Sequence, residues 1–125
     1  MKIFRTPTLL QLIFSGITWR LDSSSKVVYL TFDDGPMPGP TDFVLEQLAF
    51  HHAKATFFCI GDNIRKHPST FEKILKENHQ TGNHTYHHLN AWKTSAKEYV
   101  NDINRCQDLL PIGSGKNLFR PPFGR

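Results

Sequence analysis

The chain of 125 residues is 38% hydrophobic and 12% aromatic, which is enough apolar material for one globular core. Its formal net charge of +4 comes from 15 Lys and Arg residues spread along the sequence, so no basic block favours nucleic acid as a partner. No apolar run reaches the roughly 18 residues that a membrane-spanning helix needs.

Two cysteines, Cys59 and Cys106, stand far apart and neither belongs to a C-x-x-C pair. This spacing predicts neither a disulfide framework nor a cysteine-rich zinc knuckle. We expect both side chains to be buried thiols, as free cysteines usually are.

Residues 1–25 allow two interpretations. Lys2 and Arg5 precede the partly apolar stretch Leu9–Trp19, as in a secretory signal or a membrane-associated segment. Gln11 interrupts that stretch and no A-x-A-like cleavage site follows it, which favours a short amphipathic helix. The apolar face of that helix would consist of Leu9, Leu12, Ile13 and Trp19.

From Lys26 onward, short apolar runs alternate with amphipathic stretches, as in parallel strands joined by helices. Val27–Phe32 is β-branched and aromatic, which predicts a buried strand that ends at Asp33–Pro36. Thr41 is the expected N-cap of a helix that continues to about His51. Its predicted inward residues are Phe43, Val44, Gln47, Leu48 and Phe50.

The next unit repeats this order. Ala55–Ile60 predicts a second buried strand, closed by Gly61. Pro68–Glu77 predicts a helix, because proline is favoured in the first helical turn and an apolar stripe follows it. A short third strand is expected at Gln80–Gly82. The predicted inward residues of the helix are Phe71, Ile74 and Leu75.

The last third contains a loop, a helix and the start of a strand. Asn83–Asn90 is polar and predicts a loop or a helix start, after which Thr94 or Ser95 can cap a helix to Leu110. Leu118–Arg120 begins a fourth strand. The helix residues expected to face inward are Tyr99, Val100, Ile103 and Leu109.

The predicted fold class is α/β. Four strands with three intervening helices are about half of an eight-fold β/α barrel of ~250 residues. A small open sheet with helices on both faces is the alternative, although such a sheet would usually finish with a covering element.

Polar clusters follow three of the predicted strands, at the ends where β/α folds assemble active sites. Asp33 and Asp34 can approach one site because Gly35 and Pro36 break the strand there. The alternative for a bare Asp-Asp-Gly sequence is a solvated turn or a helix cap.

His84 and His88 are four residues apart, so on a helical turn both imidazoles share one face and can close on one ion. Taken alone, such a pair is more often structural or at the surface. Together with one aspartate, the pair gives the three protein ligands of a catalytic zinc site, which leaves a position for water. The second aspartate would stay uncoordinated and act as the base.

Two roles are open for Arg120, which precedes Pro121 and Pro122. It can hold the base aspartate ionised through a bidentate ion pair. It can also form a salt bridge at the surface or at the barrel rim.

Four sequence stretches together resemble the ordered motifs of the polysaccharide deacetylases, the NodB-like family 4 of carbohydrate esterases. They are T-F-D-D-G-P at Thr31–Pro36, A-T-F-F at Ala55–Phe58, G-N-H-T-x-x-H at Gly82–His88 and R-P-P-F-G at Arg120–Gly124. Each motif alone is weak, but four in this order are specific. The resemblance implies that residues 26–125 are the N-terminal part of a distorted β/α barrel, truncated after about four strands.

The resemblance also implies a role for each matching residue. Asp33 is the expected catalytic base, and Arg120 its partner. The hydroxyl of Thr85 is expected to stabilise the loop, and His87 lies outside the ligand positions. The main-chain N–H near Phe123, next to Pro122, is the expected oxyanion donor. The implied metal ligands are Asp34, His84 and His88.

The implied function is removal of N-acetyl groups from N-acetylglucosamine units of a chitin-like or peptidoglycan-like polymer, with zinc, cobalt or another divalent cation. The family's later motifs, which include a Leu-x-His general acid, are absent from these 125 residues. We therefore expect metal binding without efficient turnover by this chain, to be tested beside a version extended downstream. The alternatives are an O-acetyl esterase acting on xylan and a non-catalytic metal-binding or glycan-binding module. Membrane association stays open, as does the compartment, which is the cytoplasm, the envelope or the exterior of a bacterium.

Overall fold

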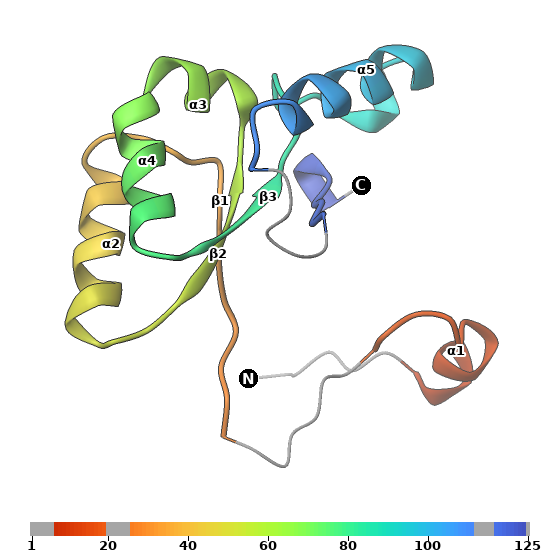
Figure 1. The fold of residues 1–125 in the computed structure, drawn as a ribbon. Coiled ribbons are helices and arrows are strands. Elements are labelled where there is room, and N and C mark those ends of the chain that lie inside the picture. Colours follow the sequence, from red (N-terminus) through yellow and green to blue (C-terminus); the bar gives the residue numbers. More distant parts are fainter. Residues whose placement is uncertain (1–6, 20–25, 112–116, 125) are drawn as a thin grey trace.

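The computed structural model describes residues 7–19, 26–111 and 117–124, and its helices and strands alternate along the chain (Figure 1). The strands are β1 (Leu30–Asp33), β2 (Ala55–Cys59) and β3 (Gln80–Asn83). The α-helices are α1 (Thr8–Ile13), α2 (Pro40–Phe50), α3 (Gly61–Lys66), α4 (Pro68–Lys76) and α5 (Ala96–Gln107). Short 3₁₀ helices are η1 (Ala91–Lys93) and η2 (Pro122–Gly124).

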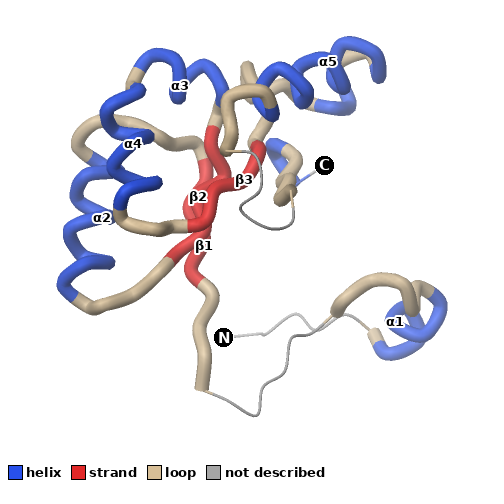
Figure 2. The backbone as a smooth tube through the Cα atoms, in the orientation of Figure 1, coloured by secondary structure: helices blue, strands red, loops and turns tan. Residues whose placement is uncertain are grey.

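The three strands form a parallel sheet in the order β1-β2-β3 (Figure 2). Parallel neighbours place their carboxyl ends at one edge of the sheet, so the residues that follow β1 and β3 lie near each other. The predicted fourth strand is reduced to one parallel bridge between Asn83 and Phe119.

The core lies between the sheet and helices α2, α3 and α4, which cover one face of it (Figure 1). Alternate residues of β2 point to opposite faces, so Ala55, Phe57 and Cys59 join the core while Phe58 faces away from it. The helical core residues are Leu45, Leu48, Ile64, Phe71 and Ile74. The prediction for β2 and for the inward residues Phe71 and Ile74 of α4 is confirmed.

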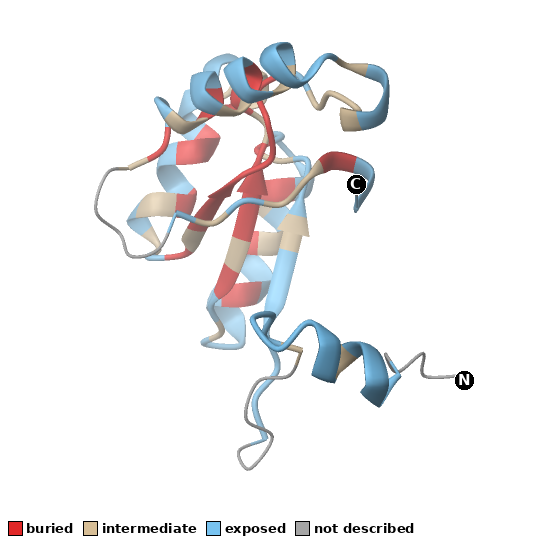
Figure 3. Ribbon diagram, turned by 90° about the vertical axis from the view of Figure 1, so that its right-hand side faces the viewer, coloured by how far each residue is buried: buried red, intermediate tan, exposed pale blue. Residues whose placement is uncertain are grey.

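The first strand differs from the prediction. It begins at Leu30 rather than Val27, and it is largely exposed where a buried strand was expected (Figure 3). β1 is the edge of the sheet, and no described strand pairs with its outer side. Val27 and Val28 therefore stay exposed despite their high strand propensity.

The start of α2 also differs. The helix begins at Pro40, whose ring fixes a helical φ, so Thr41 lies inside the helix and is not its N-cap. The Thr41 hydroxyl instead accepts the Met37 N–H at 2.9 Å. Phe43, which we predicted to be inward, is 61% exposed because it faces the β1 edge, and Phe50 at the helix end is also exposed.

Helix α3 was not predicted, because contacts distant in sequence create it. The N–H groups of Gly61 and Asp62 in its first turn donate to the carbonyls of Thr85 and Tyr86 at 3.1 and 3.0 Å. A Cβ at Gly61 would lie 2.5 Å from the Tyr86 ring, so only glycine allows this approach.

Helix α5 is confirmed in position and in its cap, since the Ser95 hydroxyl accepts the Glu98 N–H at 3.3 Å. It ends at Gln107, before the predicted Leu110. Its buried residues are Asp102 and Cys106, whereas Val100 is 52% exposed. Of the predicted inward residues, Tyr99 and Ile103 are half-buried, but Val100 and Leu109 are exposed, because this helix packs on a polar loop as well as on the apolar core.

The N-terminal helix α1 ends at Ile13 and buries none of its side chains. Trp19 lies beyond it, and its indole N–H donates to the Phe14 carbonyl at 3.1 Å. Lys2 and Arg5 lie outside the described residues, so the choice between helix and signal segment stays a prediction. Within the described ranges, no helix has the length and apolar character needed to cross a bilayer.

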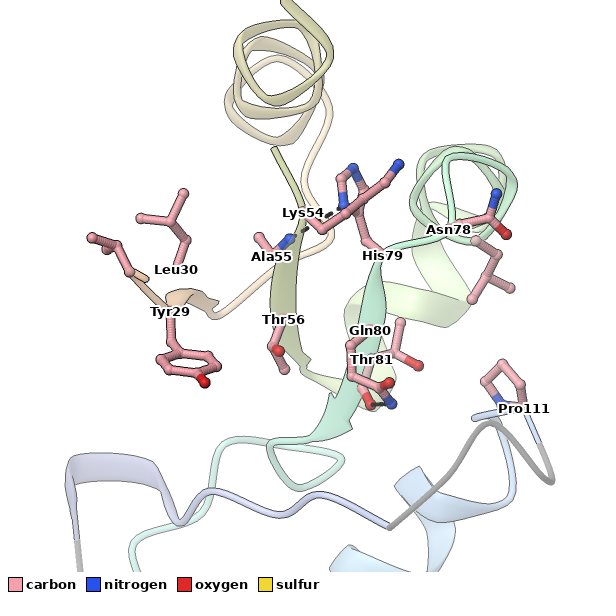
Figure 4. A pocket seen from close by; sticks show the side chains of 12 residues that line it. Tyr29, Leu30, Lys54, Ala55, Thr56, Asn78, His79, Gln80, Thr81 and Pro111 are labelled. Carbon is pink, nitrogen blue, oxygen red and sulfur yellow. Dashed lines mark hydrogen bonds between the residues drawn. The ribbon is translucent and has the colours of Figure 1, made fainter. Parts of the chain in front are cut away.

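A hollow of about 640 Å³ opens where β2 and β3 begin. Figure 4 shows its lining residues, among them Tyr29, Lys54 and His79, with the Ala55 N–H donating to Nδ1 of His79 at 3.4 Å. The polar clusters predicted from the sequence follow the opposite ends of the strands. This hollow is therefore separate from the candidate site.

Candidate metal centre

Asp34, His84 and His88 converge at the carboxyl ends of β1 and β3. One ligand atom from each of the three lies within 4.8 Å of the others. Oδ1 of Asp34 is 3.4 Å from Nε2 of His84 and 3.2 Å from Nε2 of His88. Two imidazoles and one carboxylate at this spacing can share one cation.

The turn after β1 brings Asp34 to this position. Asp33 is the last residue of the strand, and Asp34 has a left-handed φ of 67°. Two contacts hold the turn: the Asn63 side chain donates to the Asp34 carbonyl at 2.8 Å, and the Ile60 N–H donates to the Gly35 carbonyl at 2.9 Å. The reversal lets the two adjacent aspartates face one site, as the sequence predicted.

His84 is buried, and its Nδ1 lies 2.8 Å from the main-chain carbonyl of Arg120. A carbonyl only accepts, so Nδ1 carries a proton, and Nε2, which faces Asp34, is the nitrogen available to a metal. The His88 ring is partly exposed, with its centroid 5.1 Å from that of His84 and 4.7 Å from that of Phe123. One candidate ligand is thus buried, and the other is partly exposed.

Asp33 pairs with Arg120 beside the cluster. Nη1 of Arg120 donates to Oδ1 of Asp33 at 2.7 Å and to the Thr31 hydroxyl at 3.0 Å. The guanidinium carbon lies 4.1 Å above the Phe58 ring. The ion pair was predicted as bidentate, but it runs through one nitrogen, which also donates to Thr31.

The Phe58 ring packs between the Arg120 guanidinium and Gly82. A Cβ at Gly82 would lie 2.6 Å from the Phe58 ring, so glycine lets that ring pack against β3. The second Phe of the A-T-F-F stretch thus supports the guanidinium, whereas the first, Phe57, belongs to the core.

Thr85 is fully buried in a left-handed conformation with φ 63°. Its main chain holds the loop: the N–H donates to Oδ1 of Asn83 at 2.9 Å and the carbonyl accepts from Gly61 at 3.1 Å. Within the described residues its hydroxyl has no hydrogen-bond partner. The contacts that we see therefore come from the backbone of Thr85 and not from its hydroxyl.

Pro122 is buried and Phe123 is exposed with a left-handed φ of 60°, in the turn after Arg120. The Phe123 ring lies against His88, which brings this turn to the cluster. Its role as oxyanion donor stays a prediction.

Both cysteines lie buried below the site and are free thiols, as predicted. Burial raises the pKa of the Cys59 thiol far above its usual range and raises the pKa of Cys106 to about 11. Among the described residues, neither thiol belongs to the cluster of possible metal ligands.

Two polar residues near the site escaped the sequence analysis, namely Asn83 and Asp102. The Asn83 side chain is fully buried and donates to the Ile103 carbonyl at 2.9 Å and to Oε1 of Gln107 at 3.2 Å. Asp102 accepts the main-chain N–H groups of Tyr86 and His87. The sequence offered one indication of the role of Asp102. This carboxylate lies four residues before Cys106, on the same side of the predicted helix as a residue expected to be buried.

Comparison with known proteins identifies relatives of this chain. The family model for polysaccharide deacetylases matches residues 20–125. Peptidoglycan-N-acetylmuramic acid deacetylase PdaC of Bacillus subtilis is 40% identical over 106 residues, which cover 83% of this chain and 23% of that protein. A peptidoglycan-N-acetylglucosamine deacetylase of Bacillus cereus is 39% identical over 109 residues, which cover 86% of this chain and 51% of that protein.

The solved structure of PdaC from Bacillus subtilis matches with a TM-score of 0.73 at 39% identity, covering 83% of this chain and 52% of that chain. The chain thus spans about half of that structure, about half of the Bacillus cereus relative and about a quarter of PdaC. The predicted family and the predicted α/β fold class, the N-terminal portion of a NodB-type barrel, are confirmed. The chain belongs to the polysaccharide deacetylase family.

Proposed function

We propose that the protein carrying this chain hydrolyses the acetamide of N-acetylated amino sugars in a cell-wall or chitin-like polymer. The observation that carries the proposal is the convergence of Asp34, His84 and His88 within 4.8 Å, with Asp33 beside them. Relatives named as peptidoglycan deacetylases support the substrate class, since both names specify an N-acetyl group on a sugar.

The donor set fits a divalent cation. Two neutral imidazoles and one carboxylate are a ligand set of catalytic zinc sites, and the Nδ1 contact of His84 leaves Nε2 free to coordinate. Asp34, His84 and His88 would hold the ion, with zinc the first candidate and cobalt a second. When bound, such an ion lowers the pKa of water and polarises a carbonyl.

Asp33 is the proposed general base. Its carboxylate stays outside the ligand cluster and pairs with the Arg120 guanidinium at 2.7 Å. As a carboxylate, Asp33 can take the proton from the water that attacks the acetamide carbonyl. Arg120 orients Asp33, and it is itself held by Thr31 and the face of Phe58.

The turn at Pro122 and Phe123 would supply the oxyanion contact. The Phe123 ring lies against His88, so a main-chain N–H of this turn can approach the oxygen of the reacting carbonyl. Only the main chain is needed for this contact, so a Phe side chain at this position is compatible with the role.

Acetate release tests the proposal. The zinc-loaded protein carrying this chain is incubated with N-acetylated chitooligosaccharide and with peptidoglycan, beside the variants Asp33→Asn and Glu46→Gln. Removing a general base lowers rates by about 10²–10⁴-fold. We therefore expect D33N to lose activity by at least about 100-fold while its zinc content is unchanged, and the exposed-surface control E46Q to match the wild type.

The same assay separates the alternatives. Release from O-acetylated xylan but not from the N-acetylated polymers would indicate an esterase. Zinc retention with no release from any of these polymers would indicate a metal-binding module. Wild-type rates in D33N would contradict the assignment of Asp33.

A further inference from the structure

The loop that carries His84 and His88 has a backbone that requires external support. Thr85 and His88 have left-handed φ values of 63° and 57°. Such conformations cost free energy in residues other than glycine, and they persist where the surroundings over-determine them. Contacts from outside the loop must therefore hold the histidines in place.

Asp102 of α5 supplies such contacts. Its side chain is buried, and Oδ2 accepts the main-chain N–H groups of Tyr86 at 2.8 Å and His87 at 2.9 Å. Oδ1 lies 2.5 Å from Nδ1 of His87. One carboxylate thus binds two consecutive peptide groups between the two candidate ligands.

Helix α5 holds the same loop through its side chains as well. The Arg105 guanidinium carbon lies 3.7 Å above the Tyr86 ring, which is itself buried. One turn before Arg105, Asp102 occupies an inward position in line with Cys106. A buried carboxylate is unfavourable unless its oxygens are hydrogen-bonded, and here the loop provides the donors.

We infer that Asp102 is a positioning residue for the metal centre. By fixing the peptide groups of Tyr86 and His87, it aims Nε2 of His84 and of His88 at the Asp34 carboxylate. It acts through the main chain between the two histidines. The inference rests on the proposed function, because the geometry that it sets is that of the proposed metal ligands.

Two variants of Asp102 distinguish the effect of its hydrogen bonds to the loop from the effect of its side-chain volume. Asp102→Asn keeps an oxygen that can accept both N–H groups, and its amide can donate to the other tautomer of His87. Asp102→Leu has a similar volume but no acceptor. Leu110→Ala is the control: Leu110 belongs to the core, so its loss lowers stability without touching the loop.

The first measurement is the Co²⁺ affinity of the 125-residue chain. It is determined from visible absorption at a temperature well below the unfolding temperature of each variant. Loss of outer contacts to metal ligands typically weakens affinity by 10–100-fold. We expect D102L to bind Co²⁺ about 10–100-fold more weakly than the wild type, and D102N and L110A to stay within about threefold. A tenfold loss in folded D102N, or wild-type affinity in D102L, would overturn the inference.

The second readout needs no metal. Amide hydrogen exchange at Tyr86 and His87 in the metal-free chain, relative to amides of β2, should accelerate in D102L and stay slow in D102N. Unchanged protection in D102L would also overturn the positioning role. If the wild type binds no Co²⁺, the proposed function fails, and the exchange data then decide the role of Asp102 by themselves.

Discussion

The two edges of the sheet differ in how much of each edge is covered by other parts of the chain. At the β3 edge, Asn83 is fully buried, its N–H donates to the Leu118 carbonyl at 2.8 Å and its carbonyl accepts from Arg120 at 3.0 Å. At the β1 edge, Leu30 is 39% exposed and Val28 is 79% exposed. No strand among the described residues pairs with the outer side of β1.

This difference shows which contacts hold the residues of the candidate site in place. The loop after β3 is fixed by α5 and by the segment at 117–124, so the two histidines are held by contacts on both sides. The β1 edge contributes Asp33 and Asp34 through a turn anchored on Asn63 and Ile60. The site therefore depends on the β3 edge and on this turn, and much less on the outer side of β1.

Replacing Asn83 should have the largest effect on stability. Asn83→Leu would leave the Ile103 carbonyl and the Thr85 N–H without their buried partner. We expect the free energy of unfolding in urea to fall by about 2–4 kcal/mol. Asn104→Leu, at an exposed position of α5, should change it by less than about 0.5 kcal/mol. Equal effects in the two variants would remove the distinction that we draw for the β3 edge.

Arg120 links the two edges, so its side chain should matter for the reaction more than for metal binding. Arg120→Met removes the contacts to Asp33 and Thr31 but keeps the main-chain carbonyl that His84 uses. Acetate release by the protein carrying this chain should fall by about 10–100-fold with zinc content unchanged. Arg65→Met, an exposed change on α3, serves as the control. Loss of zinc in R120M would show that the side chain supports the ligands instead.

His79 lies at the opposite end of the strands, where its protonation should affect stability. Burial, followed by the nearby Lys54 ammonium, lowers the pKa of His79 from its ordinary value of 6.5, while Glu77 opposes the shift. The folded state thus favours neutral His79. Its contribution to stability is complete above about pH 6.5 and is lost as the pH falls through the lowered folded-state pKa.

Urea unfolding of the metal-free chain at about pH 7.5 and about pH 5 measures this effect, since the two values bracket the ordinary histidine pKa. His79→Asn keeps an acceptor for the Ala55 N–H but does not titrate. The wild type should lose more stability between the two pH values than this variant does. An identical loss in both would show that other groups cause the acid sensitivity.

The smallest effect is expected at the β1 edge. Val28 lies outside the strand and is 79% exposed, so Val28→Thr should change the free energy of unfolding by less than about 0.5 kcal/mol. A loss of 1 kcal/mol or more, well beyond what an exposed site gives, would mean that this segment is covered in solution.

The sequence predicted best what depends on local patterns. Strand β2, helix α4 and the Ser95 cap follow from apolar periodicity and capping chemistry. The clustering of Asp34, His84 and His88 followed from the rule that parallel strands share their carboxyl ends. Helix α3 and the inward side of α5 could not be predicted, because contacts with a loop distant in sequence determine both. The exposure of β1 depends on neighbours that strand propensity does not reveal.

X-ray absorption of the zinc-loaded chain tests most directly whether one cation is held by Asp34, His84 and His88. The account predicts one zinc per chain, with two imidazole nitrogens at about 2.0–2.1 Å and a carboxylate oxygen at about 2.0–2.2 Å. The double variant His84→Ala with His88→Ala should retain no zinc. Stoichiometric zinc with fewer than two imidazoles, or unchanged binding in the double variant, would contradict the central claim.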